Sequence, residues 1–285
     1  MTILITGTSG FIGSNLVKYL QKKKKKFVGI DKILNPYFKF KNFIKVDLKN
    51  KSKVEKIIRK KNIKSIIHLA AIPGFVNCHN SPEDAFKNNI EATFNLILAC
   101  KKNNVKNFIL ASSMGVDNYL DNPSVYGLSK YVCENIGGTF NKVFNMDIKV
   151  CKISNVFGPY SKHKTSSVHA FIKNILNEEK IKIHKKGLQK RDFIFVDDVC
   201  KKLVLCSTNK IKSKEIYINT NKFLRIIDMA LLLSKISKKN SKLKFIKTPA
   251  GYDDKIYNKP VMRINKSFIK KLEITYNWYM SNQNY

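Results

Sequence analysis

The chain has 285 residues, a hydrophobic share of 44% and a formal net charge of +34. This length and composition indicate a folded protein with a large core, and they exclude a disordered or fibrous chain. The basic excess is almost entirely lysine, because the only arginines are Arg59, Arg191, Arg225 and Arg263. Specific nucleic-acid readers depend on the guanidinium fork, so we expect solvated lysines and no specific nucleic-acid partner.

Two further absences in the sequence indicate a cytoplasmic protein without a membrane partner. No apolar stretch reaches the roughly 18 residues that a membrane-spanning helix needs, and the first residues show no signal-peptide pattern. The cysteines contain no C-x-x-C pair, which indicates reduced core residues and no metal site. They are Cys78, Cys100, Cys133, Cys151, Cys200 and Cys206.

Short apolar runs rich in β-branched residues alternate with helical patterns. The runs are TILIT (2–6), FVGI (27–30), FIKV (43–46), SIIHLA (65–70), NFILAS (107–112) and IKVCKIS (148–154). This alternation predicts an α/β fold with a Rossmann-type, doubly wound parallel sheet. The rhythm changes after NVFGPY (155–160). We therefore predict a Rossmann domain over 1–157, with a return of the chain at about 193–220, and a smaller lobe over most of 158–285.

Three glycines stand between the first strand pattern and the helix pattern that follows it. Gly7 permits a tight bend, Gly10 lets the backbone approach a pyrophosphate, and Gly13 lets the helix pack closely on the sheet. The next strand ends in Asp31, where a carboxylate can accept hydrogen bonds from the adenosine ribose and repel a 2′-phosphate. The pattern predicts a dinucleotide site and favours NAD over NADP, although the neighbouring Lys32 could tolerate the phosphate. Ordinary turn residues are the alternative explanation.

A tyrosine and a lysine lie four residues apart in VYGLSKYVCEN (125–135), which puts Tyr126 and Lys130 on one helical face. We expect the Lys130 ammonium, together with the positive nicotinamide ring of the cofactor, to lower the pKa of the Tyr126 phenol from about 10, so that Tyr126 can accept a hydroxyl proton. Ser112 and Ser113 end a strand at the carboxyl edge of the sheet, where ligands of open α/β sheets bind. Taken alone, a Tyr–Lys pair at this spacing is common on surface helices, and a serine at a strand end can be a helix cap or a turn residue.

The ordered set of motifs resembles the extended short-chain dehydrogenase/reductases, specifically the NAD-dependent nucleotide-sugar epimerases and dehydratases of the UDP-glucose 4-epimerase type. The resemblance covers nearly the whole chain. Besides Asp31 and the Tyr126–Lys130 pair, it rests on GTSGFIG (7–13), VDL (46–48), HLAA (68–71), NNIEATFNL (88–96), ASS (111–113), ISNVFGP (153–159) and RDFIFVDDV (191–199).

The resemblance implies that NAD is the cofactor and that the Rossmann domain binds it. The implied cofactor-binding residues are Gly7, Gly10, Phe11, Ile12, Gly13, Asp31, Asp47, Leu48, Leu69, Ala70, Ala71, Asn89, Tyr126 and Lys130. Within this set, Asp47 would contact the adenine, Ala70 and Ala71 would form a wall behind the cofactor, and Asn89 would be a structural residue near the active site.

The resemblance also implies catalytic roles for Ser113, Tyr126 and Lys130. The implied substrate-binding residues are Ser113, Asn155, Arg191 and Arg263, with Arg191 at the diphosphate of a nucleotide sugar. The smaller lobe would then bind the substrate. As simpler alternatives, Asn155 could cap a turn and Arg191 could pair with a neighbouring aspartate, Asp192 or Asp197.

The leading functional hypothesis is an epimerase that transiently oxidises the fourth carbon of a nucleoside-diphosphate sugar and returns the hydride. The alternatives are a 4,6-dehydratase, another oxidoreductase or decarboxylase, or a non-catalytic dinucleotide- or RNA-binding protein. Dehydratases of this family carry an Asp-Glu pair directly after the catalytic threonine, whereas Met114 and Gly115 follow Ser113 here.

Two departures from the family pattern leave the sugar and its base open. Asp117 stands where an aromatic residue is customary, and the segment from Ser113 to Tyr126 is short. The resemblance also implies a homodimer, for which EATFNLILACKK (91–102) and YVCENIGGTFNKVF (131–144) could supply the helices.

Overall fold

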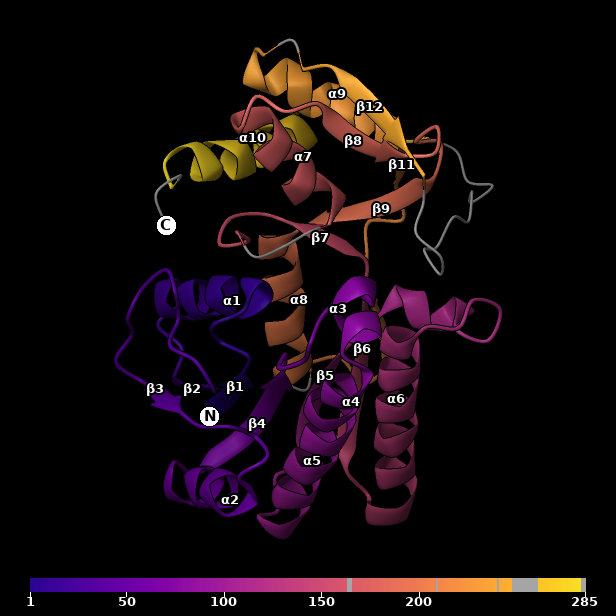
Figure 1. Cartoon of the computed structure of the whole chain (residues 1–285). Helices are drawn as coiled ribbons and strands as arrows, with labels where there is room; N and C mark the ends of the chain where they lie inside the picture. The colour runs from indigo at the N-terminus through magenta and orange to yellow at the C-terminus, as the bar shows by residue number, and fades with distance from the viewer. Residues whose placement is uncertain (163–165, 209, 240, 248–260, 283–285) are drawn as a thin grey trace. The chain divides into compact units, whose positions relative to one another are not determined.

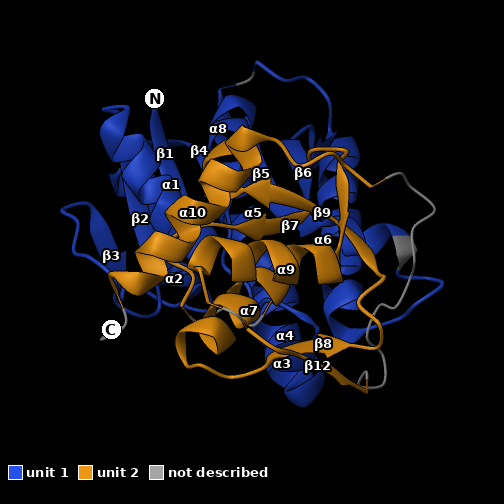
Figure 2. Ribbon diagram, turned by 90° about the horizontal axis from the view of Figure 1, so that it is seen from above, with its two compact units in different colours: residues 1–153, 199–218 blue, residues 154–198, 219–285 orange. Residues whose placement is uncertain are grey.

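The computed structural model describes residues 1–162, 166–208, 210–239, 241–247 and 261–282 (Figure 1). By its internal contacts the chain divides into two compact units, which Figure 2 shows in different colours. Unit 1 contains residues 1–153 and 199–218, and unit 2 contains residues 154–198 and 219–285. The assignment of the cofactor to the first part of the chain and of the substrate to the later part stays a prediction.

Unit 1 is built on a seven-stranded sheet with the order β10-β6-β5-β4-β1-β2-β3. All neighbouring strands of this sheet are parallel. Its strands are β1 (Thr2–Thr6), β2 (Phe27–Asp31), β3 (Phe43–Lys45), β4 (Ile63–His68), β5 (Asn107–Ser113), β6 (Asp147–Ile153) and β10 (Glu215–Ile218). Each of the six apolar runs overlaps one of these strands, so the predicted Rossmann-type α/β class is confirmed.

Helices connect most of the strands of unit 1, and α2, α5 and α6 pack on one face of the sheet around a core that includes Leu4, Leu96 and Phe140. The helical elements are α1 (Phe11–Lys22), α2 (Lys51–Lys60), α3 (Phe75–Asn80), α4 (Pro82–Ala85), the π-helix η1 (Phe86–Glu91), α5 (Ala92–Lys102), the 3-10 helix η2 (Met114–Asn118), α6 (Val125–Phe144) and α8 (Val196–Ser207). Helix α8 begins in unit 2 and continues in unit 1 from residue 199.

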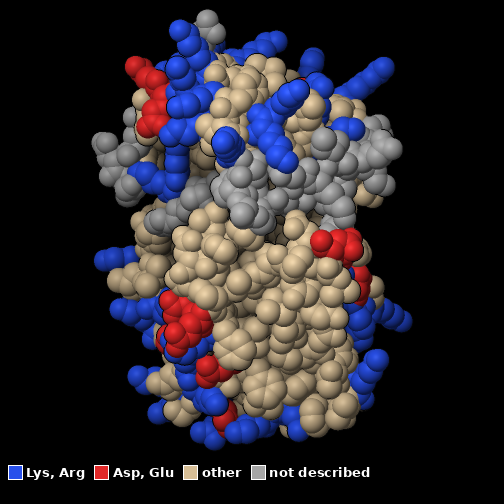
Figure 3. All heavy atoms as spheres, turned by 45° about the vertical axis from the view of Figure 1, so that its right-hand side comes forward, with Lys and Arg blue, Asp and Glu red and all other residues tan. Residues whose placement is uncertain are grey.

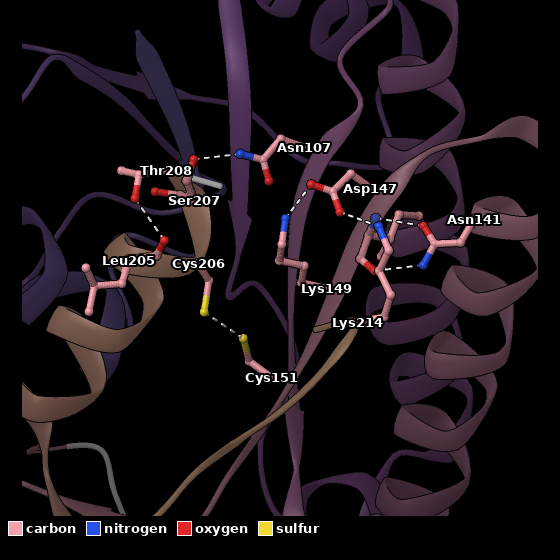
Figure 4. Close-up of polar contacts among 11 residues, drawn as sticks. Asn107, Asn141, Asp147, Lys149, Cys151, Leu205, Cys206, Ser207, Thr208 and Lys214 are labelled. Carbon is pink, nitrogen blue, oxygen red and sulfur yellow. Dashed lines mark hydrogen bonds and ion pairs between the residues drawn. The ribbon is translucent and has the colours of Figure 1, made fainter. Parts of the chain in front are cut away.

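The alternation of side chains along β6 shows that α8 covers the opposite face. Ile148 lies in the core under α5 and α6, and Cys151, three residues later, therefore points to the other side of the pleat. There the Cys151 sulfur lies 3.9 Å from the sulfur of Cys206 on α8 (Figure 4). At the end of α8, the Ser207 carbonyl oxygen accepts a hydrogen bond from the Asn107 amide of β5 at 2.6 Å.

The described residues of unit 2 form two small sheets and three helices around a separate core that includes Phe157, Phe171 and Leu233. Its sheets have the orders β11-β9-β7 and β12-β8. The elements are β7 (Asn155–Phe157), α7 (Ser167–Leu176), β8 (Ile181–His184), β9 (Lys190–Phe195), β11 (Phe223–Arg225), α9 (Ile226–Ser237), β12 (Leu243–Ile246) and α10 (Lys266–Met280).

All six cysteines are buried, and none of them is in a disulfide bond. Among the described residues, no helix combines the length and the apolar character that are needed to cross a membrane.

Helix α1 lies against the turn after β1 because Gly13 has no side chain. A Cβ atom at Gly13 would overlap the carbonyl oxygen of Gly7 and would lie 2.8 Å from the Cα of Thr8. Both are backbone atoms, so neither can rotate away. The close approach of the helix that the third glycine predicted is therefore present, and it is to the turn that follows β1.

We expect Gly13→Ala to lower the free energy of unfolding by about 3 kcal/mol, because the added methyl group forces the turn and the helix apart. The control is Gly138→Ala in α6, where a Cβ would meet no atom within 4 Å. That change should stabilise the protein by about 0.5–1 kcal/mol through helix propensity. Urea denaturation followed by circular dichroism measures both. Equal stability of Gly13→Ala and the wild type would contradict the packing described here.

Candidate active site

The turn after β1 is pressed against the loop after β4. Gly7 has a φ of +73°, and a Cβ atom there would lie 2.7 Å from the backbone nitrogen of Ala70. The hydroxyl of Thr6 accepts hydrogen bonds from the backbone N–H of Leu69 at 3.2 Å and of Ala70 at 3.1 Å. Sequence-predicted residues from the two loops, Gly7 with Leu69 and Ala70, therefore lie together at the carboxyl edge of the sheet.

The second glycine of the turn opens onto free space. Gly10 precedes the first residue of α1, and within 4 Å a Cβ there would meet only the Gly7 oxygen, at 3.3 Å. The N-terminus of α1 adds the positive end of a helix dipole, which favours phosphate. Phe11 is buried and Ile12 is half-buried at the start of this helix.

The carboxylate at the end of β2 is tied to the same turn. Asp31 accepts a hydrogen bond from the backbone N–H of Ser9 at 2.9 Å and another from that of Ile33 at 3.3 Å. A carboxylate has about four lone-pair sites, so it retains acceptor capacity for ribose hydroxyls. The ammonium of the neighbouring Lys32 donates to Asn88 at 3.3 Å. The glycine turn, the N-terminus of α1 and the Asp31 carboxylate together fit a dinucleotide.

The remaining predicted cofactor residues lie at the ends of β3 and β4. Asp47 follows β3 and accepts from the backbone N–H of Lys49 at 2.9 Å, whereas Leu48 is buried in the core of unit 1. Ala71 is half-buried in the loop after β4.

Asn89 lies in the π-helix η1 and joins the loop after β4 to α6. Its side chain accepts from the backbone N–H of Ile72 at 2.7 Å and donates to the Ile72 carbonyl at 3.1 Å and to the Ser129 hydroxyl at 3.0 Å. Only 1% of Asn89 is exposed. Single π-turns of this kind are frequent at functional sites. These contacts support the structural role near the active site that the sequence predicts.

Helix α6 carries the predicted base and its lysine at the active edge of the sheet. The helix begins at Val125 because the Ser124 hydroxyl accepts from the backbone N–H of Gly127 at 3.0 Å. The Lys130 ammonium donates to the Ala111 carbonyl oxygen on β5 at 3.0 Å and lies 6.0 Å from the centre of the Tyr126 ring.

A hydrogen bond also links Tyr126 to the hydroxyl of Ser113. The structure therefore brings the three predicted catalytic residues together.

The protein groups around Tyr126 do not lower the pKa of its phenol, and the lowering expected from Lys130 together with the nicotinamide ring stays a prediction. Burial raises the pKa of Tyr126 to about 12, although the hydrogen bond with Ser113 acts in the opposite direction. Burial also lowers the pKa of Lys130. Desolvation of the phenolate is therefore the largest influence on the pKa of Tyr126.

The sequence analysis missed His68, although it lies in the quoted motif HLAA. His68 is 2% exposed, and its ring nitrogens are hydrogen-bonded to the hydroxyls of Thr6 at 2.7 Å and Thr93 at 2.8 Å. Burial, followed by the charge of Lys130, lowers the pKa of His68 to about 3. The ring is therefore neutral near pH 7 and adds no second positive charge beside Lys130.

The three predicted substrate residues of unit 2 lie around one sheet. Asn155 begins β7 and donates to the Asp192 carbonyl oxygen at 3.3 Å. Arg191, on β9, pairs in register with Leu224 on β11. Arg263 follows Met262, whose backbone N–H donates to the carbonyl of Phe223 on β11 at 2.8 Å.

Asp192 is one of the two aspartates that could pair with Arg191 according to the sequence. Its carboxylate accepts hydrogen bonds from Ser154, Thr220 and Lys222.

No group of three or more His, Cys, Asp or Glu side chains is placed to hold a metal ion in the described part of the chain.

The model of the NAD dependent epimerase/dehydratase family matches residues 3–218. The chain belongs to this family. Its cofactor is therefore NAD, for which the glycine turn and Asp31 provide a fitting site.

Three known proteins illustrate the similarity within this family. A UDP-glucuronate 4-epimerase of Thermodesulfobacterium geofontis is 31% identical over 223 residues, which cover 70% of this chain and 69% of that protein. The structure of a UDP-N-acetylglucosamine 4-epimerase from Methanobrevibacter ruminantium, in complex with UDP-N-acetylmuramic acid, is similar with a TM-score of 0.84 and 28% identity, and the match covers 98% of each chain.

A UDP-glucuronic acid 4-epimerase from Bacillus cereus, in complex with UDP-glucuronic acid and NAD, has a TM-score of 0.83 and 26% identity over 99% of each chain.

We expect Gly10→Val to weaken NAD binding about 100-fold, because its side chain would fill the space that the turn leaves for the pyrophosphate. Calorimetric titration with NAD measures the change. A Cβ at Gly10 would meet one atom, the Gly7 oxygen at 3.3 Å, so the thermal unfolding temperature should fall far less than in Gly13→Ala. Gly138→Ala serves as a control with normal NAD affinity. An unchanged NAD affinity of Gly10→Val would contradict the prediction that this turn binds the pyrophosphate.

Proposed function

We propose that the protein is an NAD-dependent epimerase that inverts the fourth carbon of a UDP-sugar. The observation that carries the proposal is the convergence of Ser113, Tyr126 and Lys130 in the same unit as the glycine turn. Three similar proteins, which are 4-epimerases of UDP-linked sugars, support the substrate class.

Tyr126 is the group that takes the proton of the 4-hydroxyl and later returns it. The hydroxyl of Ser113, which is hydrogen-bonded to the phenol, binds the same sugar oxygen and keeps it within reach. Lys130 supplies the chain's own positive charge beside the phenol, and this charge opposes the desolvation that disfavours the phenolate. Bound NAD supplies a reversible two-electron acceptor.

The residues of the sheet β11-β9-β7 in unit 2 are proposed to hold the nucleotide sugar. Arg191 and Arg263 suit its diphosphate because the guanidinium group can bind phosphate oxygens in a bidentate manner. Asn155, which is exposed at the start of β7, offers an amide to the sugar or the base. Six buried cysteines without a disulfide bond support a cytoplasmic location, and the scarcity of arginine supports the lack of a specific nucleic-acid partner.

The family also contains dehydratases, which need a further acid and base to eliminate water. Met114 and Gly115 occupy the two positions after Ser113. The next carboxylate, that of Asp117, is engaged by the Lys152 ammonium at 2.6 Å. This arrangement favours the epimerase, which requires no such pair.

We expect Tyr126→Phe to lower turnover about 100- to 10,000-fold, because it removes the proton acceptor and leaves the ring in place. A panel of UDP-, dTDP- and GDP-sugars, analysed by mass spectrometry and proton NMR, provides the assay. An epimerase gives a product of unchanged mass and no net NADH. A product lighter by one water would identify a dehydratase, and wild-type turnover by Tyr126→Phe would overturn the catalytic assignment.

We also propose that the protein forms a homodimer through the outer face of α5 and α6. The exposed residues of α6 between its start and Lys142 are uncharged: Leu128, Tyr131, Asn135 and Thr139. On α5, Phe94 is exposed and the only charged residues are Lys101 and Lys102 at its end. The side of unit 1 that Figure 3 turns forward shows a continuous tan area with charged groups at its margins.

An uncharged face of this extent is unusual on a chain with a net charge of +34. Two copies related by a twofold axis would bring the same helices together and bury the apolar side chains without unpaired charges. A second copy fits this face because its surface is equally uncharged, whereas an acidic partner would gain more from the lysine-rich surfaces elsewhere.

We expect Thr139→Lys to convert the dimer to a monomer, because the twofold axis would place two new ammonium groups in the buried face. Light scattering coupled to size-exclusion chromatography measures the mass. Leu231→Lys, at an exposed position of α9 in unit 2, adds the same charge and should leave the dimer intact. A monomeric wild type, or a dimeric Thr139→Lys, would contradict the proposed interface.

A further inference from the structure

Helix α6 carries a third ionisable residue in line with the proposed catalytic pair. Glu134 follows Lys130 by four residues, as Lys130 follows Tyr126, so the three side chains share one face of the helix. The Glu134 carboxylate accepts a hydrogen bond from the hydroxyl of Ser112, and Lys130 donates to the carbonyl of the preceding residue, Ala111. Consecutive residues of β5 therefore anchor the carboxylate and the ammonium.

A buried lysine of β6 stands on the other side of this carboxylate. The Lys152 ammonium lies 3.7 Å from Glu134, 2.6 Å from Asp117 on η2 and 3.0 Å from Glu215 on β10. Burial raises the pKa of Glu134, whereas Ser112 and Lys152 act in the opposite direction. Lys152 thus stabilises the ionised form of a carboxylate that would otherwise be desolvated without a counter-ion.

The other ionisable groups that face Lys130 carry no compensating negative charge near pH 7. They are Tyr126 and Cys133 on α6, Cys78 on α3 and His68 on β4. Burial raises the pKa of both thiols and of the phenol, so all three are neutral. Glu134 is the described carboxylate whose charge acts on Lys130.

We propose that Glu134 is a positioning residue that keeps Lys130 protonated, so that the ammonium is available to Tyr126. The inference rests on the proposed roles of Tyr126 and Lys130. Positive and negative charges alternate from Lys152 through Glu134 to Lys130, and the phenolate of Tyr126 would complete the series. Glu134 touches neither substrate nor cofactor in this role, and it acts through the charge of Lys130.

The protonation of Lys130 can be measured without any sugar substrate. Acetic anhydride acylates only the neutral amine, so the pH dependence of acylation, read from the Lys130 peptide by mass spectrometry, gives the midpoint of its titration. Glu134→Gln keeps the size of the side chain and an acceptor oxygen for Ser112. Because it removes a negative charge one helical turn away, we expect the midpoint to fall by about one pH unit.

Two matched variants separate charge from structure. Glu215→Gln also removes a carboxylate paired with Lys152, but this carboxylate does not act on Lys130, so the midpoint should stay at the wild-type value. Glu134→Asp disturbs the same position and retains the charge, so its midpoint should stay within about half a pH unit of the wild type. Equal midpoints for Glu134→Gln and wild type, or equal shifts in both Glu134 variants, would overturn the proposal.

Steady-state kinetics provide a second readout. In Glu134→Gln the alkaline decline of kcat should begin about one pH unit lower, with little change in KM. A shifted acylation midpoint in a protein that turns over no nucleotide sugar would support the role of Glu134 and refute the proposed function. Normal epimerisation by the wild type, with an unshifted acylation midpoint in Glu134→Gln, would support the proposed function and refute the role of Glu134.

Discussion

The contact between Gly13 and the backbone of Gly7 is the constraint on which the geometry of unit 1 depends. It lets α1 lie directly against the turn after β1, and the left-handed φ of Gly7 lets the loop after β4 approach within van der Waals distance. With both loops in contact, the space beside Gly10 becomes a cradle at the carboxyl edge of the sheet. A side chain at any of the three glycines would disturb a different part of this arrangement.

The fold was predictable from sequence because its signals are local. Each strand of the main sheet up to β6 is a short apolar run, and the glycine turn and the Tyr126–Lys130 spacing are contained within a few neighbouring residues. The π-helix around Asn89 was not predictable. Its hydrogen bonds go to Ile72 and Ser129, which are distant in sequence, and such a helix has no composition of its own.

Lysine is the residue type on which the sequence was most misleading. The general excess suggests solvated side chains, yet Lys130, Lys149 and Lys152 are 8%, 1% and 7% exposed. Lys149 pairs with Asp147 of its own strand. The fold alone provides the partners of the other two, which are the Ala111 carbonyl for Lys130 and the carboxylates of three elements for Lys152. The raised pKa of Tyr126 has the same origin, because desolvation is a property of the assembled site.

The position of β10 in the chain has a consequence for the order of folding. Residues 150–153 of β6 pair with Glu215–Ile218, but residues 154–198, which belong to unit 2, are synthesised in between. A nascent chain that ends at residue 153 would present β6 as an open edge with unpaired backbone groups and exposed Cys151 and Ile153. Unit 1 can therefore close only after much of unit 2 has left the ribosome, and until then this edge is the surface most prone to aggregation.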